Sequence, residues 1–361
     1  MTRSDERLDG QGQDRRSARP APLAVPSHAL TFQALLLQAA DDGRGPLLFG
    51  DSLGRAREAV PPFLVGRDFP DVYLEHPLAG DPFLDVTVLL GQLEPGTRVG
   101  SPLAGEHGAL LDWYAGTRRE FVDVSCGFEV DTGKPEPPVS AVHFQPRGHA
   151  ELVRPFCETI GEPERADLYL DMAGRMPKGW PLSFFGLFRG RPGSPLRVCG
   201  YLSDPEVQAC AHDPEHLAAT FDAIGFSSYN SPMLEQVSSL MAAAPSLVDF
   251  QLDVLPDGTL GPTFAIDVQF GIKRPAAVRD TFGRGAGACV MGLLEDWGAA
   301  DGRWRAATCA AFARAIPVEL EDGTYGKYAL TLMPQWLKAR WVDGSLQTAK
   351  LYHLAHGDVL E

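Results

Sequence analysis

The segment Val248-Asp249-Phe250-Gln251-Leu252-Asp253-Val254 decides the fold of this chain, because apolar and polar residues alternate along it without a break. Turn-forming residues follow it in Pro256-Asp257-Gly258-Thr259, and Phe264-Ala265-Ile266-Asp267-Val268-Gln269-Phe270 then alternates in the same way. This pattern predicts a β-hairpin with one apolar face and one face of aspartate and glutamine. Such strands fit a sheet that is covered by helices on one side and faces a wet lumen on the other. A sheet face open to solvent would produce the same alternation.

Four more stretches on either side of this hairpin also read as pairs of strands joined by turn residues. The five predicted hairpins are Val72–Leu90 with a turn at Gly80-Asp81-Pro82, Phe121–Val130 with Val139–Gln145, Leu182–Phe188 with Leu196–Leu202, Leu247–Leu255 with Thr263–Phe270, and Tyr328–Met333 with Gln347–Leu354. The last one is ambiguous, because Asp343-Gly344 is itself a good hairpin turn.

Helical patterns fall between the hairpins. They cover Glu106–Arg118, Ala150–Ile160, Pro163–Met176, Glu215–Ile224, Pro232–Ala244, Gly287–Gly298 and Arg303–Ile316, with Pro317 as a stop for the last. The order is therefore helix–helix–hairpin, repeated about five times. We expect an α+β fold in which ten antiparallel strands close into a β-barrel surrounded by helices, since a flat sheet of this size would expose long edges.

Composition limits the possible functions. The 361 residues carry a net charge of −15, which argues against nucleic acid and anionic membrane surfaces as partners. The six cysteines form no CxxC pair, so buried reduced thiols are expected rather than a structural zinc site or disulfides. Residues 1–28 are polar and rich in proline and arginine, which predicts a disordered tail before a single barrel domain over 29–361. The N-terminus lacks the apolar core of a signal peptide. We expect a cytoplasmic monomer or weak homodimer.

The predicted architecture and several short strings resemble the ABBA-type aromatic and peptide prenyltransferases, whose fold is called the PT barrel. Phe83-Leu84-Asp85-Val86-Thr87-Val88 is similar to the first-hairpin strand of the magnesium-dependent bacterial branch. Arg197-Val198-Cys199-Gly200-Tyr201 resembles a third-hairpin motif that contacts diphosphate, and Leu330-Thr331-Leu332-Met333-Pro334 and Ala349-Lys350-Leu351-Tyr352 resemble the closing strands.

This resemblance implies transfer of an allylic prenyl group from its diphosphate to an aromatic or peptide acceptor, in natural-product biosynthesis, without a nucleotide or organic cofactor. The diphosphate ligands implied are Arg197, Lys350, Lys338 and Arg340, with Mg²⁺ possible on Asp85. Tyr201 and Tyr352 would shield the allylic cation. Asp249 or Asp267 would take the proton that the acceptor loses.

The sequence also departs from the family pattern. The second and fourth hairpins usually carry a lysine or arginine, but the matching positions here are Ser140, His143 and Gln145, then Ala265, Asp267 and Gln269. The expected lumen contains Asp85, Asp123, Asp249, Asp253 and Asp267. An acidic lumen stabilises a departing diphosphate only through bound Mg²⁺. The alternative is a barrel that has lost its diphosphate site and binds or modifies a cationic peptide or small molecule.

Two further motifs compete with this interpretation. Gly50-Asp51-Ser52-Leu53 spells the nucleophile block of GDSL-type serine hydrolases, and Asp213-Pro214-Glu215-His216 supplies an Asp-x-x-His. The only asparagine, Asn230, lies in the wrong place for that family, so Ser52 is better explained as a helix cap. The glycine-rich stretch 283–288 lacks the preceding strand of a dinucleotide-binding loop and fits the start of a helix.

Overall fold

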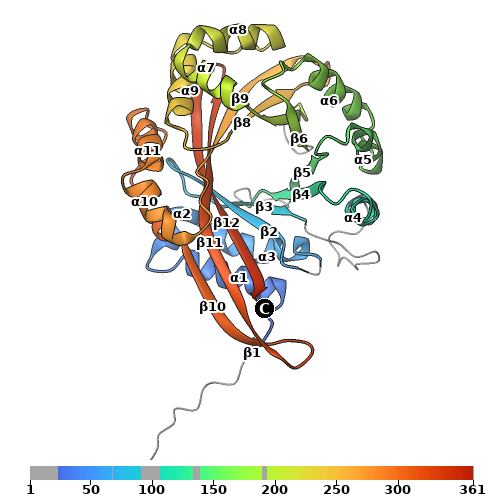
Figure 1. The fold of residues 1–361 in the computed structure, drawn as a ribbon, viewed down its shortest axis with the longest axis vertical. Coiled ribbons are helices and arrows are strands. Elements are labelled where there is room, and N and C mark those ends of the chain that lie inside the picture. The colour runs from blue at the N-terminus through green and yellow to red at the C-terminus, as the bar shows by residue number, and fades with distance from the viewer. Residues whose placement is uncertain (1–22, 67, 91–105, 133–138, 189–192, 361) are drawn as a thin grey trace, which may run out of the picture.

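The computed structural model describes residues 23–66, 68–90, 106–132, 139–188 and 193–360. Ten of its strands form a closed antiparallel barrel, and helices surround it (Figure 1). The barrel strands are β2 (Asp71–Pro77), β3 (Asp85–Leu89), β4 (Ser125–Val130), β5 (Val139–Gln145), β6 (Leu182–Leu187), β7 (Leu196–Tyr201), β8 (Val248–Val254), β9 (Leu260–Gln269), β11 (Tyr325–Val342) and β12 (Ser345–Leu360). Pairing of β9 with β11 closes the ring, so the predicted barrel is confirmed and the open sheet is wrong.

The helical layer accounts for the apolar face of each strand. Its helices are α1 (His28–Ala39), α2 (Arg44–Phe49), α3 (Ser52–Ala59), α4 (Glu106–Thr117), α5 (Val153–Thr159), α6 (Glu164–Arg175), α7 (Asp204–His212), α8 (Pro214–Ile224), α9 (Ser231–Ala243), α10 (Val278–Gly283), α11 (Ala286–Asp296) and α12 (Arg303–Cys309). Val248, Phe250 and Leu252 of β8 are buried in the core, as expected for the outward face. Asp249 and Gln251 between them are also buried, because they face the enclosed lumen. None of the described helices is long and apolar enough to cross a bilayer.

The C-terminal hairpin differs from the leading prediction and follows the alternative. β11 and β12 turn at Asp343 and Gly344, whose φ angles of 49° and 73° suit a two-residue hairpin turn. The predicted helix over Arg303–Ile316 is too long, because Phe312–Glu319 forms strand β10 along β11. Pro317 lies within β10 and does not end a helix. Strand β10 tolerates proline because it pairs along its length only with β11, so most backbone groups on its other edge have no strand to bond to.

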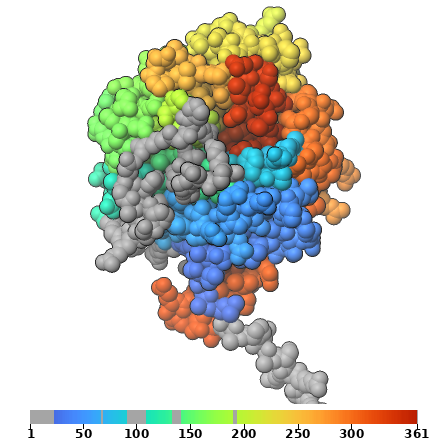
Figure 2. Space-filling model, turned by 180° about the vertical axis from the view of Figure 1, so that it is seen from behind, coloured from blue at the N-terminus to red at the C-terminus, as the bar shows by residue number. Residues whose placement is uncertain are grey.

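The long strands β11 and β12 continue beyond the barrel. Their outer halves and β10 form an extension, which protrudes below the N-terminal helices in Figure 2. Helix α1 packs on this extension, where the Thr31 and Tyr328 hydroxyls hydrogen-bond at 3.0 Å. Within the expected tail, Leu23 and Ala24 (β1) already form a strand that pairs in parallel with β10, so regular structure is present before residue 28. Residues 1–22 of the predicted tail lie outside the described residues.

The cysteines match the prediction only in part. All six are free thiols, but Cys289 and Cys309 are exposed rather than buried.

Candidate functional site

A cavity of about 560 Å³ lies inside the barrel, and every barrel strand contributes at least one side chain to its lining. Its polar lining follows from the alternation of each strand, since the residues between the outward apolar ones must face the lumen. Its acidic residues are Asp71, Glu75, Glu129, Asp249 and Asp267, and its basic residues are Arg118, Arg147, Arg197 and Lys338, with His143 beside them. The cavity therefore mixes both signs of charge rather than concentrating either.

Two buried ion pairs adjoin this cavity through Glu75 and Arg197, and we call these two pairs the floor. The Lys350 ammonium lies 2.9 Å from a carboxylate oxygen of Asp85 and 3.5 Å from one of Glu75. Arg197 donates twice to Asp253, at 2.8 and 3.2 Å. Glu75 and Arg197 line the cavity, whereas Lys350, Asp85, Asp253 and Arg340 do not. The charges of Lys350 and Arg197 are thus already balanced by carboxylates.

Asp85 forms an ion pair with Lys350, which makes it a poor ligand for a metal ion. Burial raises the pKa of Asp85 to about 7, against the opposing effect of the Lys350 charge. Burial alone would lower the pKa of Lys350, but Asp85 and Glu75 outweigh it and raise that pKa above its ordinary value. A magnesium ion prefers several oxygen ligands in an octahedral arrangement, and an ammonium group at 2.9 Å competes for the same carboxylate. The residues here do not fit the expected Mg²⁺ site.

Asp249 of β8 and Asp267 of β9 are register partners and lie side by side in the lumen. A glutamine of the opposite strand donates to each carboxylate: Gln269 to Asp249 at 2.9 Å, and Gln251 to Asp267 at 2.7 Å. The second oxygen of each carboxylate, Oδ1, is buried and has no hydrogen-bond partner among the described residues. Burial, then the neighbouring Asp267, raises the pKa of Asp249 to about 7, and burial raises that of Asp267 to about 6. The two groups can therefore hold or release a proton near neutral pH.

An aromatic wall stands next to this pair. Tyr352 and Trp336 stack with ring centres 5.2 Å apart, and Tyr73 packs on Trp336 at 4.4 Å. The Lys338 ammonium lies 5.0 Å from the centre of the Tyr352 ring. Burial and the Glu75 carboxylate raise the pKa of Tyr352 well above its ordinary value, so its hydroxyl stays protonated. Such π-faces can stabilise a cation and exclude water.

The structure brings together most of the expected site residues. Asp249, Asp267, Tyr201, Tyr352, Arg197 and Lys338 line the cavity, whereas Lys350, Arg340 and Asp85 lie outside its lining. Asp123, expected in the lumen, is half-exposed before β4 and pairs with His149. Lys338 has no carboxylate within ion-pair distance among the residues described. Its charge is therefore less neutralised than that of Lys350, which pairs with Asp85 and Glu75.

Several lining residues were not predicted. Glu75 accepts a hydrogen bond from Thr87 at 2.7 Å, and Glu129 lies 3.4 Å from His143, which was expected at this position of the second hairpin. Tyr73 and Glu75 alternate with Val72 and Leu74, so their orientation could have been inferred from the strand pattern. Arg118 follows α4, and Arg147 follows β5; both line the cavity. No sequence pattern indicates the orientation of these two arginines, because both follow regular elements.

The serine hydrolase arrangement is not formed. Ser52 accepts a hydrogen bond from Arg55 one turn along α3, and His216 on α8 bonds to Glu206. Helices α3 and α8 lie on different sides of the barrel (Figure 1). Asp51, rather than Ser52, occupies the cap position of α3. The stretch 283–288 spans the end of α10 and the start of α11 and follows no strand directly, as expected.

The raised carboxyl pKa values predict that the protein gains stability in mild acid. A folded-state pKa raised above the unfolded value near 3.8 stabilises the fold at low pH, and this contribution disappears as pH rises through the folded pKa. We expect the melting temperature to be higher at pH 5.5 than at pH 8. Asp249→Asn should reduce this difference, as measured by thermal unfolding in matched buffers. An equal difference in the variant would contradict the assignment.

Comparison with solved structures identifies the architecture. The 5-dimethylallyltryptophan synthase from Streptomyces coelicolor superimposes with a TM-score of 0.51 at 13% identity, covering 91% of this chain and 97% of that one. The apo form of prenyltransferase PriB gives 0.51 at 14% identity, over 92% and 96% of the two chains. A 6-dimethylallyl tryptophan synthase gives 0.51 at 13% identity, over 93% and 97%. The chain has the PT-barrel fold. No sequence-family model and no curated protein matches it.

The PT barrel of this chain thus confirms the fold that the resemblance implied. Its function depends on the lumen residues, because one fold can carry unrelated chemistry.

Proposed function

We propose that this PT barrel transfers an allylic prenyl group from its diphosphate to an aromatic or peptide acceptor. The observation that carries this proposal is Lys338, a lysine that lines the cavity over the Tyr352 ring without a carboxylate partner among the described residues. PriB, which shares the fold, has been crystallised with product diphosphate (TM-score 0.50, 12% identity). Lys338 supplies charge for the leaving group, and the aromatic wall supplies the environment for an allylic cation.

The reaction would follow from these residues. The allylic carbon–oxygen bond breaks, and diphosphate leaves with the electron pair toward Lys338. Arg197 could add to this charge only by sharing its contacts with Asp253. The acceptor then attacks the allylic carbon, and the proton it loses passes to Asp249 or Asp267, whose raised pKa values suit proton transfer near neutral pH.

A second function is favoured by the Asp249–Asp267 pair. Both Oδ1 atoms are buried without hydrogen-bond partners in the described part of the chain, and burying such an acceptor costs about 1–3 kcal/mol. An organic cation that donates to both oxygens would remove this cost. A barrel that binds or modifies a cationic peptide or small molecule therefore remains the competing proposal.

Calorimetric titration with dimethylallyl and geranyl thiolodiphosphates, with and without Mg²⁺, tests the first proposal. We expect saturable binding that Lys338→Gln weakens by about tenfold or more, the usual effect of losing a charged hydrogen bond. Lys327→Gln, an exposed position on the same strand, is the matched control. Absence of binding in the unaltered protein would overturn the proposal and leave the barrel intact.

The pH dependence separates the two proposals. Lowering the pH from 8 to 6 neutralises lumen carboxylates, so a diphosphate analogue should bind more tightly and a cationic ligand more weakly. The diphosphate also changes its protonation in this pH range, so Asp249→Asn serves as the reference. The part of the pH effect on affinity that this variant removes is due to the lumen carboxylates.

A further inference from the structure

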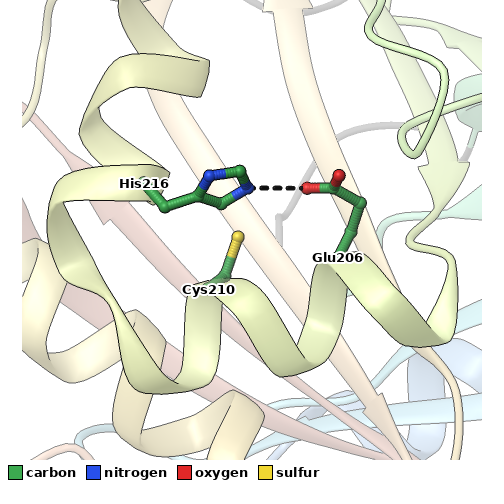
Figure 3. A group of neighbouring side chains, drawn as sticks. All are labelled: Glu206, Cys210 and His216. Atoms are coloured by element: carbon green, nitrogen blue, oxygen red, sulfur yellow. Dashed lines mark hydrogen bonds and ion pairs between the residues drawn. The ribbon is translucent and has the colours of Figure 1, made fainter.

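Glu206, Cys210 and His216 gather on the outer helical layer, away from the barrel lumen (Figure 3). Glu206 and Cys210 are one turn apart on α7, and His216 lies in the first turn of α8. The side-chain oxygen, sulfur and nitrogen atoms of the three residues all lie within 4.8 Å of one another. This is the one such group of three or more potential ligands found in the described part of the chain.

We propose that these three residues form a binding site for a zinc ion, with water as the fourth ligand. Carboxylate, thiolate and imidazole together suit zinc, a borderline-soft ion that prefers four ligands. In a tetrahedral site with ordinary zinc bond lengths, neighbouring ligand atoms lie about 3.3–3.6 Å apart. The nitrogen–oxygen distance between His216 and Glu206 is 3.0 Å, and all three ligand atoms lie within 4.8 Å of one another. Side-chain rotations would therefore bring them to the spacing of a tetrahedral site.

The surroundings hold these ligands in place. The buried Trp180 indole donates to the same Glu206 oxygen at 3.3 Å, which fixes the carboxylate from behind. A Cβ at Gly179 would lie 2.0 Å from Glu206 Cγ, so the carboxylate stem packs directly on this glycine. On the other side, Asp213 caps α8 and fixes the turn that brings His216 back over α7. Outer contacts of this kind orient metal ligands.

A metal ion can reach this site from solvent, and its binding would release a proton from the ligands. Cys210 is fully buried, whereas the His216 and Glu206 side chains are 39% and 25% exposed, which leaves a path for the ion and its water. Binding through sulfur requires the thiol to release its proton, and binding through Nε2 requires a neutral His216 imidazole whose proton is on Nδ1. Affinity should rise with pH up to mild alkali.

Titration of the full-length, metal-free protein with cobalt(II), followed by zinc, tests this proposal. We expect one cobalt ion per chain, a thiolate-to-cobalt charge-transfer band and tetrahedral visible bands, all displaced by zinc. Cys210→Ser should abolish the charge-transfer band, and His216→Gln, at a partly exposed position, should weaken zinc binding without affecting the fold. Trp180→Phe should lower affinity by about 10–100-fold, as is typical of outer contacts.

Cys289→Ser is the matched control, because that thiol is exposed and lies on α11. It should leave the spectrum and the stoichiometry unchanged. A spectrum without the thiolate band, a band that persists in Cys210→Ser, or one that disappears in Cys289→Ser would each overturn the proposal. None of these outcomes depends on prenyl transfer.

Discussion

Replacing Lys350 by methionine should lower the free energy of unfolding by about 3–5 kcal/mol, the usual cost of leaving buried carboxylates without their counter-charge. The ammonium lies 2.9 Å from Asp85 and 3.5 Å from Glu75 in the floor. Without it, two buried carboxyl groups on paired strands repel each other until one takes up a proton. Urea unfolding monitored by fluorescence measures the effect.

Two further variants separate the charge from the packing. Lys350→Met combined with Asp85→Asn removes both members of the pair, so it should recover much of the lost stability. Lys178→Met, at an exposed position, should change little. The deficit of Lys350→Met should be larger at pH 8 than at pH 5.5, because protonation of Asp85 relieves the repulsion. Unchanged stability in Lys350→Met would mean that the floor is not held by this ion pair.

This result would also decide between two roles for Lys350. The family resemblance implied that Lys350 binds diphosphate, whereas in the structure it lies outside the cavity lining and pairs with two carboxylates. A loss of stability with little change in the affinity for a thiolodiphosphate would assign Lys350 to the floor. Lys338, its register partner on β11, would then be the lysine available to the ligand.

The barrel was predictable because its determinants are local. Alternation along residues 248–254 fixes which side chains face inward, and the two-residue turn at Asp343-Gly344 fixes the last hairpin. Because the sheet closes into a barrel, the side chains on both of its faces become buried. The extent of β10 was not predictable from its own residues, because 312–319 becomes a strand only by pairing with β11. Propensity is a weak guide where such tertiary pairing decides.

The candidate site was predictable as a set of inward positions but not as a set of contacts. Asp249 and Asp267 could be placed in the lumen from alternation alone. Whether a lysine faces the ligand or a carboxylate depends on its height in the barrel, which the stagger between strands sets. Lys338 and Lys350 are opposite each other on neighbouring strands, yet only Lys338 lines the cavity. Trp336 was missed because the predicted strand ended at Met333, three residues too early to include it.

Asp249→Asn should lower the turnover number for prenyl transfer by about 10²–10⁴-fold if Asp249 is the proton acceptor of the proposed reaction. Asparagine keeps the shape of the side chain and can still accept the hydrogen bond from Gln269, so the change removes mainly the basicity. Affinity for a thiolodiphosphate should stay the same or improve, because a negative charge leaves the lumen. Single-turnover rates and calorimetry separate the two effects.

The companion variant Asp267→Asn identifies which carboxylate accepts the proton. The Asp267 charge raises the pKa of Asp249, so its removal should lower that pKa below about 7. A general base must be unprotonated, so the acidic limb of the rate profile should move to lower pH in Asp267→Asn while most of the plateau rate remains. If Asp267 is the base instead, the plateau falls in Asp267→Asn and survives in Asp249→Asn. Full activity in both variants would exclude the pair from proton transfer and leave its unpartnered oxygens to a cationic ligand.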